Sequence, residues 1–165
     1  MKELYYLRCR ECGKKYPNSP QSFCEECFSP LEVSYDYDAL SQKAKRESLV
    51  HRAFNMWRYA ELLPLPEGFT PSHSIGGTPL AKSRKLGAQW GIKNLYFKND
   101  AVCSPTLSFK DRVVGTALAA ARRFGFKTVG CSSTGNLANA VPHKARSKAS
   151  TPLFSSLPTS NPPKF

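Results

Sequence analysis

The sequence predicts an α/β protein with a small cysteine module near its N-terminus, and two patterns carry this prediction. Four of the six cysteines lie in the first 40 residues, as two Cys-x-x-Cys pairs. From residue 75 onward, short apolar runs rich in β-branched and aromatic residues alternate with helix-like segments. Such alternation is typical of helices packed on a largely parallel sheet. A chain of 165 residues has room for one small module and one modest domain.

Changes in composition divide the chain into four predicted segments. Residues 1–40 form the cysteine module, residues 41–74 a partly helical linker, and residues 75–141 the α/β segment. Residues 142–165 contain no glycine and no acidic residue, but five prolines and five serines. We expect this last segment to be disordered or to come from an aberrant reading frame. A helix that begins at Asn136 should therefore end near Pro142.

Periodicity and turn residues predict the individual elements. The expected strands are 4–7, 31–35, 94–98 and 128–133, and the expected helices are 56–63, 80–90, 108–124 and one from 135 onward. Gly125 is the expected C-cap of the helix over 108–124, which carries two arginines in its last turn. The segment 75–80 is an expected turn.

The net charge of +12 is distributed unevenly, which argues against a nucleic-acid partner. Residues 1–40 hold five Lys or Arg and seven Asp or Glu, whereas residues 81–165 hold fourteen basic and two acidic residues. A nucleic-acid-binding ribbon needs its positive charge on the cysteine module, where this chain has none in excess. The apolar runs are too short to span a membrane, and the first residues lack a secretory signal. We therefore expect a cytoplasmic protein with neither a nucleic acid nor a membrane as partner.

The cysteine pairs predict a metal site. Cys9 and Cys12 are separated by two residues, as are Cys24 and Cys27, and a hairpin can bring the two pairs together. Four thiolates suit a structural Zn²⁺, because its filled d shell imposes no competing geometry. Forty residues with so few aliphatic side chains need the metal in order to fold. Two disulfides, iron or a degenerate site are the alternatives. The two remaining cysteines, Cys103 and Cys131, are expected to be packed thiols.

A lysine at the start of the helix over 108–124 is a candidate catalytic residue. Ser108 is the expected N-cap, and Asp111 completes a pair that resembles a capping box. Lys110 has no place in this scheme, because a cation in the first turn faces the positive end of the helix dipole. A lysine that forms a Schiff base fits such a position. The alternative is a solvated lysine that pairs with Asp111 or Asp100.

The loop over 132–136 is a candidate binding site for an anionic group. It joins an expected strand to a helix N-terminus, where backbone N–H groups point outward. Ser133, Thr134 and Asn136 add polar side chains, and Gly135 allows close approach. An ordinary capped turn between strand and helix is the alternative.

Taken together, these segments resemble the threonine synthase family of fold-type II pyridoxal-phosphate enzymes. The matching motifs are, in the family's order, the four-cysteine ribbon ending in 30–37 (PLEVSYDY), 57–59 (WRY), 76–80 (GGTPL), 98–100 (KND), 105–112 (PTLSFKDR) and 133–139 (STGNLAN). The resemblance runs from about residue 5 to residue 141. The lysine motif is common to fold-type II enzymes, whereas the ribbon ahead of it narrows the resemblance towards threonine synthase.

The resemblance implies a fold, a reaction and a set of site residues. The fold would be a zinc-ribbon-like module followed by an incomplete domain of the tryptophan synthase β type. Lys110 would carry pyridoxal 5'-phosphate and shuttle protons, Asn136 would bind the cofactor ring oxygen, and Ser133, Thr134 and Gly135 would hold the substrate carboxylate. The reaction would convert O-phosphohomoserine to threonine and phosphate. A serine/threonine dehydratase or a non-catalytic zinc-ribbon fragment is the alternative.

Family members continue well beyond the matched region. Their further residues carry the glycine-rich loop for the cofactor phosphate and the partner of the pyridine nitrogen. We therefore expect this chain to be truncated or frameshifted after about residue 141, and to be inactive as a fragment. A full-length version is expected to form a homo-oligomer.

Overall fold

The computed structural model describes residues 4–65, 68–69, 71 and 74–145. The first part of the chain is a three-stranded antiparallel sheet of β1 (Tyr5–Cys9), β2 (Lys15–Tyr16) and β3 (Leu31–Tyr35), in the order β2-β1-β3. Leu7 lies opposite Val33 on one neighbour and opposite Tyr16 on the other. A small core of Leu7, Tyr16, Cys9 and Cys24 lies against this sheet, so the module is built around its cysteines.

Three short helical segments follow the ribbon. They are α1 (Tyr37–Lys43), α2 (Arg46–Leu49) and the 3₁₀ segment η1 (Met56–Leu62). Asp36 caps α1 by accepting a hydrogen bond from Ala39 N, and Asn55 caps η1 by accepting one from Trp57 N. Asp and Asn are favoured at such positions because their side-chain oxygens satisfy free backbone donors. Within residues 41–74, where a partly helical linker is expected, the described part contains α2 and η1.

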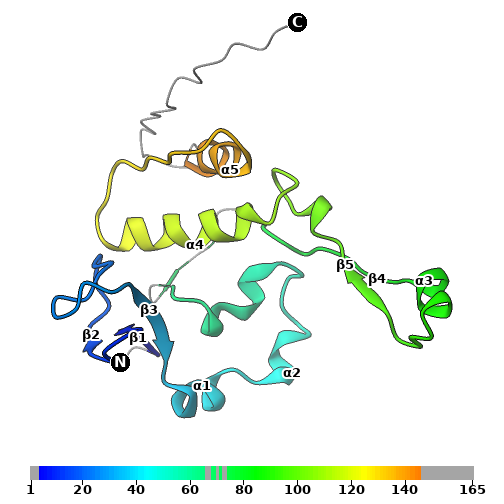
Figure 1. Cartoon of the computed structure of the whole chain (residues 1–165), viewed down its shortest axis with the longest axis horizontal. Helices are drawn as coiled ribbons and strands as arrows, with labels where there is room; N and C mark the ends of the chain where they lie inside the picture. The colour runs from blue at the N-terminus through cyan, green and yellow to red at the C-terminus, as the bar shows by residue number, and fades with distance from the viewer. Residues whose placement is uncertain (1–3, 66–67, 70, 72–73, 146–165) are drawn as a thin grey trace, which may run out of the picture.

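Helix α4 (Lys110–Arg123) lies at the centre of the molecule (Figure 1). It meets η1 at Gly115, where a Cβ would lie 2.6 Å from Ile75 Cδ1 and 3.3 Å from Trp57 Cη2. A side chain at this position would therefore force Ile75 and Trp57 to shift, whereas glycine fits, although it weakens the helix intrinsically. The other side of α4 packs against α5 (Asn136–Ala145) through Val114, Ala140 and Val141.

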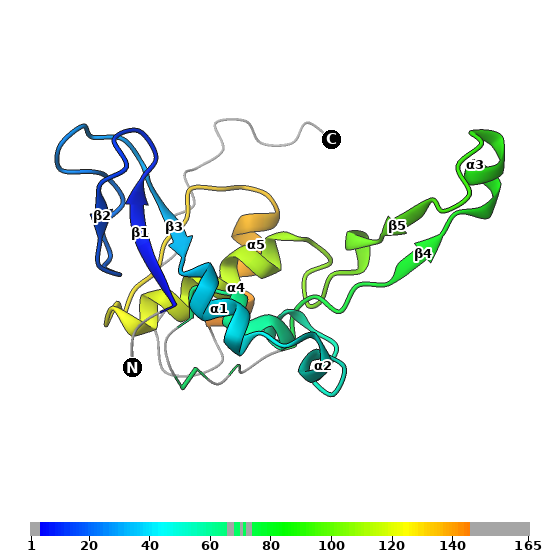
Figure 2. The ribbon, with the colours of Figure 1, turned by 90° about the horizontal axis from the view of Figure 1, so that it is seen from below.

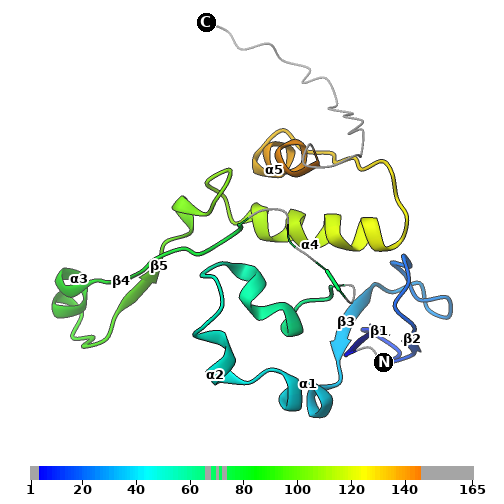
Figure 3. The ribbon, with the colours of Figure 1, turned by 180° about the vertical axis from the view of Figure 1, so that it is seen from behind.

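The ribbon is tied to the C-terminal end of α4. Figures 1 and 3 both place β1–β3 beside this end of the helix, with α5 covering its opposite side. Arg123 Nη1 donates a hydrogen bond of 2.7 Å to Tyr5 Oη, and its guanidinium lies 5.9 Å from the Tyr5 ring centroid. The cysteine module and helix α4 are thus in direct contact.

A hairpin arm projects away from the rest of the chain, as Figure 2 shows. It consists of β4 (Leu80–Lys82), α3 (Arg84–Gln89) and β5 (Tyr96–Lys98), and the short 3₁₀ segment η2 (Asp100–Val102) follows it. β4 and β5 pair antiparallel, with Leu80 opposite Lys98. All six residues of these two strands are exposed, and a lone two-stranded ribbon is marginal in water.

The expected parallel sheet is wrong for the residues that the structure describes. Both sheets there are antiparallel, and residues 128–133 form no strand. The backbone over 128–133 lacks a strand beside it, and a strand exists only where a neighbour accepts and donates its backbone hydrogen bonds. The expected helix over 80–90 is shorter, because its first residues belong to β4.

Helix α5 also differs from the expectation, because it continues through Pro142 to Ala145. Proline removes one backbone donor from a helix interior. Burial of Ala140 and Val141 against α4 offsets this loss. Most of the segment expected to be disordered or aberrant, residues 146–165, lies outside the described residues. Within the described ranges, none of the helices has the length and apolar character that crossing a membrane requires.

Candidate functional site

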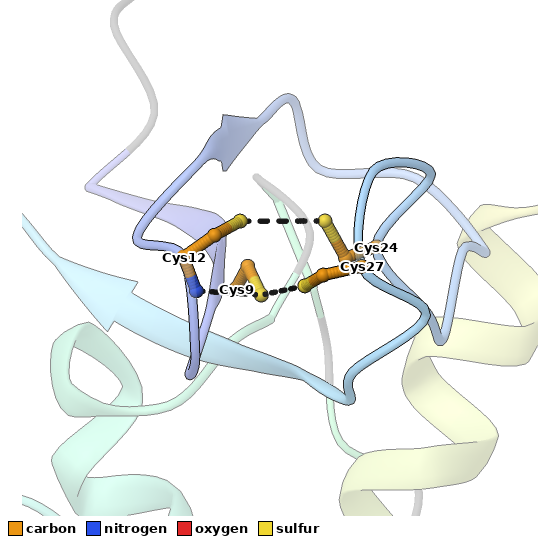
Figure 4. A group of neighbouring side chains, drawn as sticks. All are labelled: Cys9, Cys12, Cys24 and Cys27. Atoms are coloured by element: carbon orange, nitrogen blue, oxygen red, sulfur yellow. Dashed lines mark hydrogen bonds between the residues drawn. The ribbon is translucent and has the colours of Figure 1, made fainter.

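The four module cysteines converge on one point (Figure 4). Their Sγ atoms all lie within 4.8 Å of one another, with Cys9 and Cys27 3.4 Å apart and Cys12 and Cys24 3.6 Å apart. In a tetrahedral zinc–thiolate centre, Zn–S bonds of about 2.3 Å place the sulfurs about 3.8 Å from one another. The sulfur–sulfur separations exceed the roughly 2 Å of a disulfide, and all four cysteines are free thiols. The geometry therefore fits a metal ion rather than two disulfides.

The two cysteine pairs sit in matching turns. Gly13 N donates to Cys9 O at 3.1 Å, and Phe28 N donates to Cys24 O at 3.0 Å. Both of the donating residues have positive φ, +76° at Gly13 and +57° at Phe28. A left-handed residue after the second cysteine turns each loop so that its two thiols point to the same side. Gly13 predicts a left-handed conformation from the sequence, whereas Phe28 gives no such indication.

Tyr16 supports one of the thiols from behind. Its Oη accepts a hydrogen bond from Glu25 N at 3.0 Å, which leaves its own proton for Cys24 Sγ at 3.1 Å. This hydrogen bond, together with nearby backbone amides, lowers the pKa of the Cys24 thiol to about 6. Metal binding requires the thiolate, so this contact favours the binding-competent form. Tyr16 is a functional residue that sequence analysis missed.

Lys110 is the first residue of α4, as the sequence predicts. Its backbone N–H donates to Ser108 Oγ at 3.3 Å, and its Nζ lies 4.7 Å from the Phe109 ring centroid. The expected capping box is wrong in one respect: Asp111 Oδ1 and Oδ2 accept hydrogen bonds from the Thr106 hydroxyl and backbone N–H instead. The alternative, a solvated lysine paired with Asp111, is also wrong, because the Asp111 carboxylate accepts hydrogen bonds from Thr106.

The other proposed lysine partner, Asp100, is engaged by an arginine. Arg112 Nη1 and Nη2 donate to Asp100 Oδ2 and Oδ1 at 2.6 and 2.7 Å, in the bidentate geometry of a strong ion pair. Thr78 bridges both partners through its hydroxyl. The Arg112 hydrogen bonds lower the pKa of Asp100. This network joins Thr78, Asp100 and Arg112, and so it fixes the start of α4. Among the described residues, Lys110 therefore has no carboxylate partner.

The loop ahead of α5 carries the remaining predicted site residues. Asn136 is the first residue of α5, and Gly135 N donates to Ser133 Oγ at 3.2 Å. Thr134, Gly135 and Asn136 are exposed, so their polar groups are available to a ligand. α5 packs on α4 at Val114, one helical turn from Lys110. The structure therefore puts the lysine and the loop on two helices that touch each other.

Cys103 and Cys131 are packed thiols, as expected. Cys103 is fully buried, and Cys131 packs against the cluster of Val114, Ala140 and Val141. Neither belongs to the group of cysteines that could hold a metal.

Known proteins resemble this chain over most of its length. The sequence model of the family "Pyridoxal-phosphate dependent enzyme" matches residues 71–164, more than half of the chain. The chain therefore belongs to the family of pyridoxal-phosphate dependent enzymes. Its relatives include threonine synthases of Methanocaldococcus jannaschii, 41% identical over 142 residues, and of Methanosarcina acetivorans, 38% identical over 156 residues.

The shares of the chains covered differ strongly. The alignments cover 85% and 94% of this chain, but 35% and 37% of the two archaeal proteins. A threonine synthase of Halalkalibacterium halodurans is 40% identical over 94 residues, which are 53% of this chain and 26% of that protein. The chain thus spans about a third of the length of the archaeal relatives.

Proposed function

We propose that this chain is the cofactor-lysine part of a threonine-synthase-like lyase, with Lys110 as the residue that binds pyridoxal 5'-phosphate. The observation that carries the proposal is the position of Lys110 in the first turn of α4, without a carboxylate partner among the described residues. The two acids near it in the sequence, Asp100 and Asp111, bind other described residues. Its amine is therefore available for a covalent bond to a carbonyl compound.

Residues of the loop ahead of α5 would complete the cofactor site. Asn136 at the start of α5 would donate to the cofactor ring oxygen, and Ser133, Thr134 and Gly135 would hold the substrate carboxylate with hydroxyl and backbone donors. When bound, the cofactor supplies an electron sink that stabilises a carbanion next to the amino group. Lys110 Nζ would then move the proton between the substrate carbons. The proposed substrate is O-phosphohomoserine, and the products are threonine and phosphate.

The four cysteines would hold a structural zinc ion. All four coordination positions would be filled by protein thiolates, so the ion would have no open position for substrate. Its role would be to fold residues 4–35, because two of the four residues of their small core are cysteines. The contact between Tyr5 and Arg123 would in turn steady the helix that carries Lys110.

The activity of the whole enzyme is part of the proposal, because this chain matches only a third of its archaeal relatives. The cytoplasmic location and the homo-oligomer remain predictions. The four domain boundaries also remain predictions. Among the relatives named above, all are threonine synthases, and none is a dehydratase.

Covalent trapping tests the cofactor lysine directly. The zinc-loaded chain is mixed with pyridoxal 5'-phosphate, reduced with borohydride and digested, and the labelled peptide is identified by mass spectrometry. We expect the label on Lys110 and its loss in Lys110→Ala. Lys93→Ala, which removes an exposed lysine of the hairpin arm, is the matched control and should keep the label. Labels spread evenly over many lysines would refute the assignment.

Phosphate release from O-phosphohomoserine tests the reaction. The measurement is made on the 165-residue chain and on a protein extended to the length of its archaeal relatives. Threonine formation by the extended protein, and its loss with Lys110→Ala, supports the proposed reaction. Formation of 2-oxobutanoate from threonine instead would indicate a dehydratase.

A further inference from the structure

A hollow of about 450 Å³ lies between η1 and α4, apart from the lysine and loop described above. Its described lining includes neither Lys110 nor any residue of 133–136. The volume is in the range of small-molecule sites. Its walls are mostly apolar, but they include three cations: Arg58, Lys98 and Arg112. No acidic side chain belongs to the described lining.

Two described acids, Glu61 and Asp100, are already paired with arginines. Glu61 forms a bidentate pair with Arg52 at 2.6 and 2.7 Å, and Asp100 forms one with Arg112. Lys98 Nζ donates to the Thr78 carbonyl and lies close enough to lower the pKa of Asp100, as a smaller effect than that of Arg112. Among the described residues, three cations thus line the hollow with one carboxylate beside them, which leaves an excess of positive charge there.

Arg58 is the residue whose hydrogen bonding is incomplete. Its Nη2 donates to Leu49 O, whereas its Nε is buried and has no hydrogen-bond partner. A buried donor without an acceptor costs free energy, so the hydrogen bonding of the Arg58 guanidinium is incomplete among the described residues. The guanidinium lies 5.4 Å from the Phe54 ring centroid and 5.8 Å from that of Tyr59.

The Phe54 ring lies against both of the lining cations that form no ion pair with a described residue, Arg58 and Lys98. Lys98 Nζ lies 5.6 Å from the Phe54 ring centroid, so Arg58 and Lys98 both lie against Phe54. The segment that carries Phe54 is fixed against the turn at 76–77. A Cβ at Gly77 would lie 2.4 Å from Phe54 O, so only glycine allows this approach. The cations are therefore held in place by packing before any ligand arrives.

We propose that the η1–α4 hollow binds a small organic anion, with its phosphate or carboxylate group on Arg58 and Lys98 and its apolar body against Phe54 and Tyr59. The Arg58 guanidinium and the remaining protons of Lys98 Nζ supply the donors. A dianionic phosphate matches the excess charge better than a monoanionic carboxylate does. The site does not use Lys110, so it is independent of the proposed cofactor chemistry.

Side-chain NMR of the zinc-loaded, cofactor-free chain tests this site. The probes are phenyl phosphate, inorganic phosphate and benzoate, and the reporter is the Nε–H signal of Arg58. We expect saturable shifts with phenyl phosphate, binding weaker by at least about tenfold in Arg58→Gln, and weaker binding of the other two probes. Arg84→Gln removes an exposed arginine of the arm and is the charge-matched control, which should bind like the parent chain.

Two further variants separate the outcomes. Thr116→Met fills the hollow from α4 without a change of charge, and it should also abolish binding. Lys110→Ala should bind phenyl phosphate as the parent does, so that failure of the cofactor proposal leaves this result unchanged. An Arg58 signal that does not move with phenyl phosphate would overturn the inference. Equal losses in Arg58→Gln and Arg84→Gln would do the same, because they indicate non-specific charge attraction.

Discussion

Gly115 sets two physical effects against each other, and the structure decides the sign of a substitution there. Alanine in place of a glycine in a helix interior stabilises the helix by about 1 kcal/mol. At this position, however, the new Cβ would lie 2.6 Å from Ile75 Cδ1 and 3.3 Å from Trp57 Cη2. Ile75 is 1% exposed and has little room to move. Overpacking of this kind costs about 1–3 kcal/mol.

We therefore expect Gly115→Ala to destabilise the chain by about 1 kcal/mol net, taking an overpacking cost of about 2 kcal/mol. Urea unfolding of the zinc-loaded chain, followed by tryptophan fluorescence, gives the free energy of unfolding. Ala117→Gly, at an exposed position of the same helix, is the control for helix propensity and should cost about 1 kcal/mol. A higher urea midpoint for Gly115→Ala would show that α4 and η1 do not pack as described.

Three other predictions concern the ribbon and the ion pair near α4. Phe28→Gly should stabilise the zinc-bound ribbon by about 0.5–1 kcal/mol, because Phe28 has φ +57° and its side chain is 79% exposed. Thermal unfolding with zinc bound, and with a chelator present as the control, measures the effect. A lower unfolding midpoint for the zinc-bound variant would contradict this. Tyr16→Phe removes the hydrogen bond to Cys24 and should weaken zinc binding about 10–100-fold, measured by competition with a chelator. An unchanged affinity would show that this contact does not contribute to zinc binding. Arg112 lowers the pKa of Asp100 below its usual 3.8, so the ion pair stabilises the fold above pH 3.8 and is lost as the pH falls through the lowered pKa. The difference in unfolding free energy between the parent and Asp100→Asn should therefore close in acid. A difference that does not depend on pH would refute the pairing.

The sequence predicted the local elements well where short-range chemistry determines them. The strand over 31–35 matches β3, and the helix over 108–124 matches α4 to within two residues at its N-terminus and one at its C-terminus. The spacing of Cys9, Cys12, Cys24 and Cys27 predicted one metal-binding group, and the structure brings their sulfurs together. These features depend on side-chain periodicity and on spacings of two residues, which can be read along the chain.

Long-range partners could not be predicted in the same way. The expected pairing of Asp111 with Ser108 failed because Thr106 offers a closer donor pair, and the expected lysine partner Asp100 binds Arg112. The expected strand over 128–133 failed because a strand depends on a neighbour, which no local pattern contains. The left-handed turn at Phe28 carries no glycine to announce it.

The sequence by itself determined the cysteine group, the position of Lys110 at a helix start and the polar loop over 133–136, because each depends on residues a few positions apart. Only the tertiary structure decided which groups lie against each other. It placed Tyr16 on Cys24, tied Tyr5 to Arg123, and left Arg58 Nε buried without an acceptor. These contacts involve residues that are far apart in the chain or that lie in no recognisable motif. Many other residues could form the same kinds of contact, so only the packing of the folded chain selects the actual partners.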